Sequence, residues 1–508
     1  MTARCVMVLG TTSGAGKSWL ATALCRWYAR RGLKVAPFKA QNMSNNARVV
    51  AGGEIGSAQY FQALAARAAP EVRMNPLLLK PERDTHSQVV LLGRVDEALS
   101  RRSWRGRSAS VWPQVSGALD ELRAENDVVV IEGAGSPAEI NLKDDDIVNM
   151  RVALHADARC LLVTDIDRGG AFAHLYGTWA LLPEHERALI RGFVLNKFRG
   201  DATLLAPAPQ LLQELTGIAT VATLPMWWNH GLPEEDGWYS LPPPPGEGGG
   251  GGAPGAQAGG AVASGPGAPP PQPSPGGGGS KNIAIVAYPR ISNLDEFQPL
   301  AHLPGVRLRW VRSAGELEGA DWVVLPGSKH TSSDLAWLRE QRIDRALAAH
   351  AQRGGAVLGV CGGLQMLGEA LVDPHGIDGN APGLGLLPLV TQFEPDKTVR
   401  RTQATFGALR GTWSALSGVP VSGYEIRHGR TAQHPAMDAG LPVLPAGLGW
   451  QNAAGNVLGV YLHGLFEDAN VLRALFGAQA PDPDRVFDNL ADFIDRHFAA
   501  GVLEELIR

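Results

Sequence analysis

A cysteine set among glycines is the residue best suited to covalent chemistry. In Gly359-Val-Cys-Gly-Gly363, an apolar run at 356–360 leads directly into Cys361, and a segment with a helical pattern follows. Small residues permit a tight strand-to-helix turn that presents the thiol at a sheet edge, where the helix N-terminus favours the thiolate. Cys361 could therefore attack a carbonyl carbon. The alternative, an inert buried thiol, is our interpretation of the other three cysteines, whose spacing suits neither disulfides nor zinc.

This nucleophile needs a base and donors for an oxyanion. His463 follows the apolar run at 457–461 and is predicted to lie at the end of a strand, so we assign it as the base. The loop Leu325-Pro-Gly-Ser-Lys-His330 is predicted to provide an oxyanion donor from the backbone of Gly327, beside the N–H group of Gly362. A core or surface histidine is the alternative for His463.

Together these features resemble the class I glutamine amidotransferase domain. The resemblance implies that Cys361 attacks the carboxamide of glutamine while His463 transfers protons, which forms a γ-glutamyl thioester and releases ammonia. Many domains of this class carry a glutamate two residues after the histidine, where this chain has Leu465. Glu467 or Asp468 could replace it, or the site could work as a dyad, so the third member stays unassigned. A degenerate domain that serves only as a scaffold, with free ammonia as nitrogen donor, is a further alternative.

A second candidate site is Gly10-Thr-Thr-Ser-Gly-Ala-Gly-Lys-Ser18, between an apolar run and a helical pattern at 19–30. This is the context of a phosphate-binding loop, although Thr11 stands where the usual spacing has glycine. Backbone amides would surround the phosphates of ATP, and Lys17 would reach the β- and γ-phosphates. The loop resembles the dethiobiotin synthetase-like branch of phosphate-loop enzymes, which activate carboxylates by phosphorylation. A glycine-rich turn without ligand is the alternative. The predicted nucleotide-binding residues in this loop are Gly10, Thr11, Gly14, Gly16, Lys17 and Ser18.

Oxygen ligands for Mg²⁺ are expected near this loop. The Ser18 hydroxyl is one candidate, and Glu132 and Asp165 are two others because each ends an apolar run predicted to be a strand. Acids at strand ends also cap helices, so each acid could have either role. Asn196 ends a further run, and its amide could hydrogen-bond the edge of a nucleobase.

Alternating apolar and helical segments are predicted to position both sites. This alternation favours a parallel sheet covered by helices, once before residue 242 and again after residue 280. Between them, 242–280 contains 15 glycines and 11 prolines in 39 residues and cannot build a core. The predicted strands are 5–9, 34–38, 128–131, 160–164, 192–195, 283–287, 322–325, 356–360 and 457–461. We therefore predict an α/β chain with a phosphate-loop (dethiobiotin synthetase-like) parallel-sheet domain at 1–241, a Pro/Gly-rich linker at 242–280 and a class I glutamine amidotransferase domain at 281–508.

Charge and hydropathy argue against several classes of partner. The net charge is -4 and no block of Lys and Arg stands out, so we expect no nucleic acid partner. No apolar stretch approaches the ~20 residues of a spanning helix, and the first residues lack the pattern of a signal peptide. We therefore expect a cytoplasmic protein that does not enter a membrane.

Longer stretches carry a further signal, and they include Pro37-Phe-Lys-Ala-Gln-Asn-Met-Ser-Asn-Asn46, Gly53-Glu-Ile-Gly-Ser-Ala-Gln59, Met74-Asn-Pro-Leu-Leu-Leu-Lys-Pro81, Glu132-Gly-Ala-Gly-Ser-Pro137, Asp165-Ile-Asp-Arg-Gly-Gly170 and Asn196-Lys-Phe-Arg-Gly200. These stretches resemble the cobyric acid synthase family of adenosylcobalamin biosynthesis. The resemblance covers the chain outside 242–280, a linker longer than the family leads us to expect. It implies the use of ATP, Mg²⁺ and glutamine to amidate the b, d, e and g carboxylates of adenosylcobyrinic acid a,c-diamide, giving adenosylcobyric acid.

Within the first stretch, the resemblance points to a surface for the corrinoid. Gln41, Asn42, Ser44 and Asn45 offer amides and a hydroxyl, which suit the amide-decorated rim of such a substrate, whereas a plain polar loop is the alternative. Two other functions are weighed. Cobyrinic acid a,c-diamide synthase shares both domain types but differs in its N-terminal motifs. A switch-type partitioning ATPase has a related phosphate loop but would leave Cys361 without a purpose.

Overall fold

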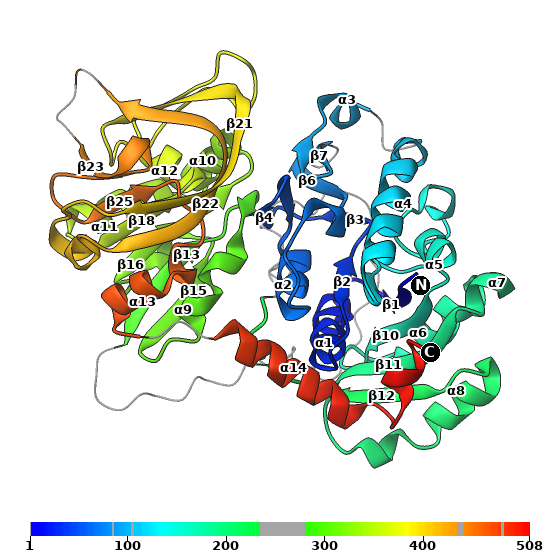
Figure 1. The fold of residues 1–508 in the computed structure, drawn as a ribbon. Coiled ribbons are helices and arrows are strands. Elements are labelled where there is room, and N and C mark those ends of the chain that lie inside the picture. The colour runs from blue at the N-terminus through cyan, green and yellow to red at the C-terminus, as the bar shows by residue number, and fades with distance from the viewer. Residues whose placement is uncertain are drawn as a thin grey trace, which may run out of the picture.

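The chain folds as two α/β domains that lie side by side (Figure 1). This computed structural model describes residues 2–83, 86–102, 106–228, 230–233, 280–434, 436, 440–478 and 482–508. The linker predicted at 242–280 lies outside the described residues except for Ser280. The predicted fold class, a phosphate-loop parallel-sheet domain joined to an amidotransferase α/β domain, is confirmed.

A parallel sheet of six strands forms the centre of the N-terminal domain, in the order β12-β11-β10-β1-β9-β2. Five of these strands coincide with the predicted apolar runs. β12 was missed because its Thr-Val-Ala-Thr-Leu-Pro sequence contains no run of large apolar residues. The bounds are β1 (Arg4–Gly10), β2 (Val35–Phe38), β9 (Val128–Glu132), β10 (Arg159–Asp165), β11 (Ile190–Phe198) and β12 (Thr220–Pro225).

Successive residues of each strand point to opposite faces of this sheet, and both faces are covered. Val6, Val8 and Val130 share one apolar cluster with helix α1 (Lys17–Arg30). Met7 and Ile131 belong to a second cluster, on the other face. That face is covered by α4 (Arg107–Glu125), α5 (Met150–Ala156) and α6 (Ala171–Leu181). Burial on both sides explains why the strands are continuous apolar runs.

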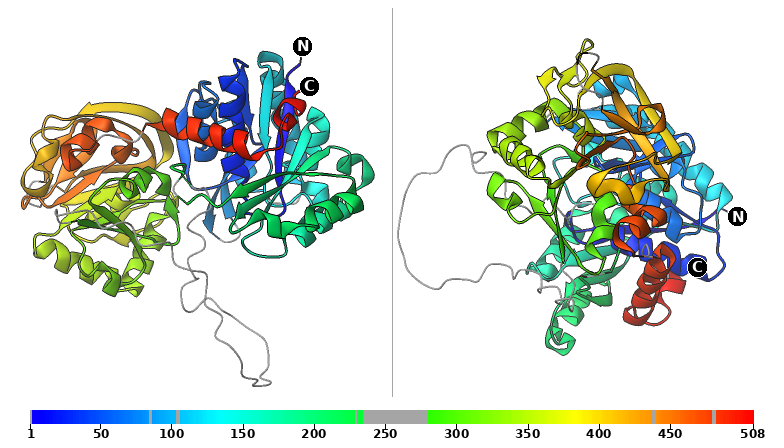
Figure 2. Two further views of the ribbon diagram at one scale, coloured as in Figure 1. Left: turned by 90° about the horizontal axis from the view of Figure 1, so that it is seen from below. Right: turned by 90° about the vertical axis from the view of Figure 1, so that its left-hand side faces the viewer.

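The C-terminal segment returns to the N-terminal domain. Helix α14 (Pro483–His497) lies along α1 in both views (Figures 1 and 2), and α15 (Val502–Glu505) follows it. Phe487 and Leu490 are buried in the same cluster as α1, while Arg26 pairs with Asp488 at 2.7 Å. The structure therefore differs from the predicted assignment of 281–508 to one amidotransferase domain, because 483–508 pack on the phosphate-loop domain.

We expect Leu490→Ala to lower the free energy of unfolding by about 2–5 kcal/mol, because Leu490 is fully buried between α14 and α1. Urea denaturation of the full chain measures this change. Asp492→Asn is the matched control on the same helix, since Asp492 is exposed and its ion pair with Arg30 is worth less than about 1 kcal/mol. Equal effects of the two substitutions would contradict the packing of α14 described above.

A seven-stranded sheet forms the centre of the C-terminal domain, in the order β15-β13-β16-β18-β25-β24-β23. The first five strands are parallel, and β24 and β23 extend the sheet in antiparallel pairing. The strands are β13 (Lys281–Val286), β15 (Val306–Val311), β16 (Trp322–Leu325), β18 (Ala356–Val360), β23 (Leu441–Leu444), β24 (Gly449–Gln451) and β25 (Val457–Val460). The main helices are α10 (Thr331–Glu340), α11 (Ile343–Gln352), α12 (Gly362–Leu367) and α13 (Ala469–Phe476). The four strands predicted here are confirmed.

Smaller sheets lie where the two domains meet. A long antiparallel hairpin of the C-terminal domain contacts strand β4 of the N-terminal domain. This contact brings residues 41–46, called the polar stretch below, close to the amidotransferase domain. The hairpin is β21 (Leu389–Thr405) and β22 (Pro420–Gln433), and the N-terminal strands are β3 (Gln41–Met43), β4 (Ala47–Val50), β5 (Gly53–Gly56), β6 (Leu77–Arg83), β7 (His86–Leu91) and β8 (Arg94–Val95).

Candidate active sites

Cys361 occupies a strained turn between β18 and α12. Its backbone has φ 50° and ψ -104°, a conformation that non-glycine residues rarely adopt. The N–H group of Cys361 donates to the carbonyl oxygen of Val460 at 2.8 Å, which anchors the turn to the neighbouring strand β25. The predicted placement of the thiol at the end of a buried strand is found in the structure.

Two glycines after the cysteine are required by close packing. A Cβ atom at Gly363 would overlap the carbonyl oxygen of Leu325, and one at Gly362 would lie 2.8 Å from the backbone nitrogen of Ser328. A Cβ atom at Gly327 would lie 2.9 Å from Cε1 of His463. Both residues predicted to form the oxyanion hole, Gly327 and Gly362, therefore lie beside the catalytic candidates.

His463 is held by a glutamate from a distant part of the chain. Its Nδ1 lies 2.9 Å from Oε1 of Glu296, whose Oε2 accepts a hydrogen bond of 2.7 Å from the N–H group of Gly464. Burial alone would lower the pKa of His463, but the carboxylate of Glu296 and the thiol of Cys361 raise that pKa to about 10. Glu296 therefore stabilises the imidazolium and fixes the ring orientation.

Glu296 fills the third position that sequence reasoning left open. Of the two substitutes considered there, Glu467 pairs with Arg48, and Asp468 caps α13 by accepting from the N–H group of Asn470 at 2.8 Å. Neither contacts His463 through an interaction in the described part of the chain, so the structure corrects that suggestion. Glu296 lies in a short acidic turn, and no spacing relative to His463 marks it in the sequence.

We expect Glu296→Gln to lower the glutaminase kcat and to move the alkaline limb of its pH profile to lower pH. The carboxylate raises the pKa of His463 to about 10, so its neutralisation lets that pKa fall toward the ordinary 6.5. Because the imidazolium must donate a proton to the leaving ammonia, activity is then lost at a lower pH. The pH dependence of kcat/KM for glutamine hydrolysis tests this expectation, and an unchanged alkaline limb would contradict it.

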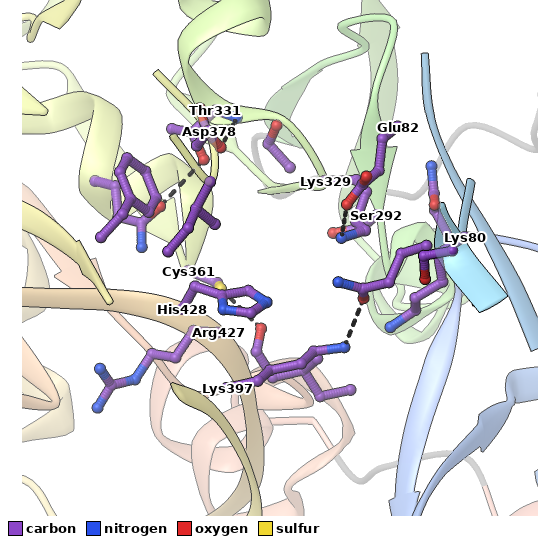
Figure 3. A pocket seen from close by; sticks show the side chains of 18 of the residues that line it. Lys80, Glu82, Ser292, Lys329, Thr331, Cys361, Asp378, Lys397, Arg427 and His428 are labelled. Carbon is purple, nitrogen blue, oxygen red and sulfur yellow. Dashed lines mark hydrogen bonds and ion pairs between the residues drawn. The ribbon is translucent and has the colours of Figure 1, made fainter. Parts of the chain in front are cut away.

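A cavity of about 550 Å³ joins Cys361 to the phosphate-loop domain. Figure 3 shows Cys361, Arg427 and His428 on one side and Lys80 and Glu82 on the other. Asn45 from the polar stretch and His463 also line the cavity. The thiol thus faces a space to which both domains contribute.

Ion pairs join the two domains around this cavity. Lys329 pairs with Glu82 at 2.7 Å. Lys397 of the long hairpin pairs with Glu54, which also binds Lys80 of its own domain at 2.5 Å. Figure 3 shows all three lysines. Burial opposes ionisation of Glu54, yet the two lysines lower its pKa to about 2. Burial lowers the pKa of Lys397 to about 7. Lys397 also lines a second cavity of about 630 Å³ at the same interface.

The predicted phosphate loop connects β1 to α1. Gly14 and Gly16 adopt positive φ angles of 70° and 99°, and α1 begins at Lys17. Lys17 Nζ donates to the carbonyl oxygens of Thr12 at 3.0 Å and Gly135 at 3.2 Å. The ammonium group therefore lies over the loop, at the N-terminus of a helix.

Threonine and asparagine side chains support the loop. Thr11 donates from Oγ1 to Oγ1 of Thr164 at 2.9 Å. Asn196 donates from Nδ2 to the carbonyl oxygen of Ala15 at 2.9 Å, and a Cβ atom at Gly16 would collide with this amide. The Asn196 amide group therefore holds the loop, and its contact with a nucleobase stays a prediction.

Ser18 and Glu132 come together as predicted. Ser18 Oγ donates to Oε1 of Glu132 at 2.8 Å, and the same carboxylate accepts from Lys39 at 2.8 Å and Gln62 at 2.6 Å. A hydroxyl beside a carboxylate is a donor set that fits Mg²⁺. Asp165 pairs instead with Lys197 at 3.2 Å.

Comparisons with known proteins identify the two domains. A family model described as "CobQ/CobB/MinD/ParA nucleotide binding domain" matches residues 6–232, and one described as "CobB/CobQ-like glutamine amidotransferase domain" matches residues 282–471. A protein named cobyric acid synthase from Variovorax paradoxus (strain S110) is 73% identical over 508 residues, which cover 100% of each chain. The chain belongs to the cobyric acid synthase family. A second relative of that name, from Polaromonas sp. (strain JS666 / ATCC BAA-500), is 72% identical over 99% of this chain and 98% of its own.

Membership of the cobyric acid synthase family makes the chain a glutamine amidotransferase ligase. A solved structure titled "Structure of PurLQS from Thermotoga maritima" is 17% identical, covers 42% of this chain and 99% of its own, and has a TM-score of 0.30, which is too low to add to the argument. No helix in the described part of the chain is long and apolar enough to cross a lipid bilayer.

The four predicted substrate residues of this cobyric acid synthase family member have different surroundings. Asn42 is buried and its Nδ2 lies 3.4 Å from Oε1 of Gln59, while Ser44 Oγ accepts from the N–H group of Asn46 at 3.0 Å. Asn45 donates from Nδ2 to a backbone carbonyl, and its buried Oδ1 has no hydrogen-bond partner among the described residues. Gln41 is half-buried. Of the four predicted substrate residues, Asn45 lines the cavity shared with Cys361.

Proposed function

We propose that this chain catalyses the ATP- and glutamine-dependent amidation of the b, d, e and g carboxylates of adenosylcobyrinic acid a,c-diamide, giving adenosylcobyric acid. One observation carries the proposal. A Cys361–His463–Glu296 site opens into a cavity whose opposite wall belongs to a phosphate-loop domain. This arrangement supports ammonia production on one side and its consumption on the other, in a chain of the cobyric acid synthase family. The proposal places the enzyme in the cytoplasm.

The glutaminase half begins at the thiolate of Cys361. The sulfur attacks the carboxamide carbon of glutamine, and backbone N–H groups at Gly327 and Gly362 stabilise the oxyanion. The imidazolium of His463, held by Glu296, donates its proton to the departing ammonia. Neutral His463 then activates water, which hydrolyses the γ-glutamyl thioester and restores Cys361.

The ligase half uses the phosphate loop. A corrinoid carboxylate attacks the γ-phosphate of ATP and expels ADP, while Lys17 and the loop amides stabilise charge that develops in the transition state. Ser18 and Glu132 would hold Mg²⁺, with Asp165 as a further ligand, and the ion would neutralise phosphate charge. Ammonia displaces phosphate from the resulting acyl phosphate, which forms the amide.

The shared cavity supports direct transfer of ammonia between the two halves. Ammonia released at Cys361 enters a space also lined by Lys80 and Asn45 of the phosphate-loop domain. Burial lowers the pKa of Lys80 and lowers that of Lys397 to about 7, so the part of the wall near these two lysines disfavours additional cations such as ammonium. Ammonia would thereby stay in its nucleophilic, uncharged form.

Mass spectrometry of the product tests the proposal. The purified chain is incubated with adenosylcobyrinic acid a,c-diamide, Mg-ATP and glutamine, and the expected result is stepwise replacement of four carboxyl groups by amides. Cobyrinic acid is the comparison substrate, because its conversion to the a,c-diamide would instead identify a cobyrinic acid a,c-diamide synthase. Failure to amidate either corrinoid, with glutamine hydrolysis intact, would reject the substrate.

A further inference from the structure

Residues 46–48 of the phosphate-loop domain bind the turn at 293–296, which carries Glu296. Asn46 accepts at Oδ1 from the N–H group of Leu294 at 3.1 Å, and the N–H group of Ala47 donates to Oδ1 of Asn293 at 2.9 Å. Asn46 and Asn293 are both buried. Two reciprocal hydrogen bonds therefore join the phosphate-loop domain to the glutaminase turn.

Arg48 adds charge to this contact. Its guanidinium is 3% exposed and donates from Nε to Oδ2 of Asp295 at 3.1 Å, with a second bond from Nη2 to the same oxygen. Nη1 donates to Oε2 of Glu467 at 2.7 Å. Arg48 thus binds the residue immediately before Glu296 and also the turn after His463.

A ring contact links Arg48 to the imidazole as well. The guanidinium carbon lies 5.3 Å from the ring centroid of Tyr424, and this ring stacks on His463 with centroids 5.3 Å apart and planes inclined by 22°. The backbones of Tyr424 and His463 also exchange hydrogen bonds of 3.2 and 2.9 Å. His463 is therefore enclosed by Glu296 on one side and by Tyr424 on another, and Arg48 contacts the supports of both.

We propose that Arg48 is a positioning residue for glutamine hydrolysis, supplied to the amidotransferase domain by the phosphate-loop domain. It fixes the turn at 293–296 and thereby holds Glu296 against His463. Without this cation, Asp295 would remain buried beside Glu296 and Glu467 with no opposite charge, so the turn would rearrange. The inference rests on the proposed hydrolysis of glutamine at Cys361.

The position of Arg48 also implies coupling between the two sites. Residues 42–48 run from Asn42, which contacts Gln59, to Arg48, which binds the glutaminase turn. Gln59 in turn donates to Glu132 at 3.4 Å, and Glu132 binds Ser18 of the phosphate loop. A shift of this segment during substrate binding would reach His463 through Arg48.

The test compares Arg48→Met with Arg401→Met in the full chain. Arg401 also crosses the interface, donating to the carbonyl oxygen of Val49 at 3.3 Å, but it does not bind the turn at 293–296. We expect Arg48→Met to lower the glutaminase kcat roughly 10- to 100-fold, the effect of losing charge-assisted hydrogen bonds, with a smaller change in KM. The rate of ammonium-driven amidation by Arg48→Met should stay near that of the wild type. The glutaminase kcat of Arg401→Met should also stay near the wild-type value.

Combining substitutions distinguishes positioning from a general structural role. If Arg48 acts through Glu296, Arg48→Met should cause little further loss in a Glu296→Gln background. Independent, multiplying losses would overturn the inference, as would equal loss of glutamine-driven and ammonium-driven amidation. If Arg48→Met fails to fold, Asp295→Asn removes the same ion pair and should give the same selective loss of kcat. Absence of glutaminase activity in the wild-type chain would refute the proposed function itself.

Discussion

Cys361→Ala should abolish glutamine-driven amidation, by at least about 10³-fold, while ammonium-driven amidation persists. The thiol is the nucleophile that releases ammonia, and no other described cysteine lines the cavity at the domain interface. ATP-dependent activation of the carboxylate takes place in the other domain and does not use this sulfur. The measurement is the rate of amide formation with glutamine, and separately with ammonium chloride, at saturating ATP.

Cys5→Ala is the matched control for this experiment, because Cys5 is another buried thiol but lies in β1 of the phosphate-loop domain. Both activities should survive in that variant. Equal loss of the two activities in Cys361→Ala would refute separate sites for ammonia release and ligation. Retention of glutamine-driven activity would show that another group attacks glutamine.

Both principal motifs could be recognised from the sequence because each is local. The phosphate loop from Gly10 to Ser18 and the turn around Cys361 each combine a buried strand, small residues and a helix within a few consecutive positions. The backbone conformation and the reactive side chain are then specified together. His463 could be placed for a related reason, since it lies three residues after the end of β25, a strand that its apolar sequence predicts.

Contacts between distant segments could not be read in the same way. Glu296 is separated from His463 by 167 positions, and the packing of the turn at 293–296 against the turn at 465–467 brings them together. Glu467 is closer to the histidine in sequence, but it pairs with Arg48. The docking of α14 on α1 is non-local too, because nothing in its amphipathic pattern specifies which domain it covers.

Lys17→Met should have the opposite selectivity to Cys361→Ala. We expect glutamine-driven and ammonium-driven amidation to fall together by roughly 10²- to 10³-fold, the effect of removing one donor to developing charge. Lys17 lies over the loop between Thr12 and Gly135, so its ammonium can reach phosphates that the loop amides surround. Hydrolysis of glutamine should continue, because Cys361 and His463 belong to the other domain.

Parallel assays of glutamate release and amide formation test this expectation. Lys34→Met is the control, since Lys34 is exposed and precedes β2 at the edge where the parallel strands begin, whereas the loop follows the end of β1. If Lys17→Met kept normal ammonium-driven amidation, the loop would not be the site of phosphoryl transfer. If it also stopped glutamine hydrolysis while the chain stayed folded, occupancy of the phosphate loop would control the glutaminase. That control has a structural route, from Ser18 through Glu132 and the segment at 42–48 to the turn that positions Glu296.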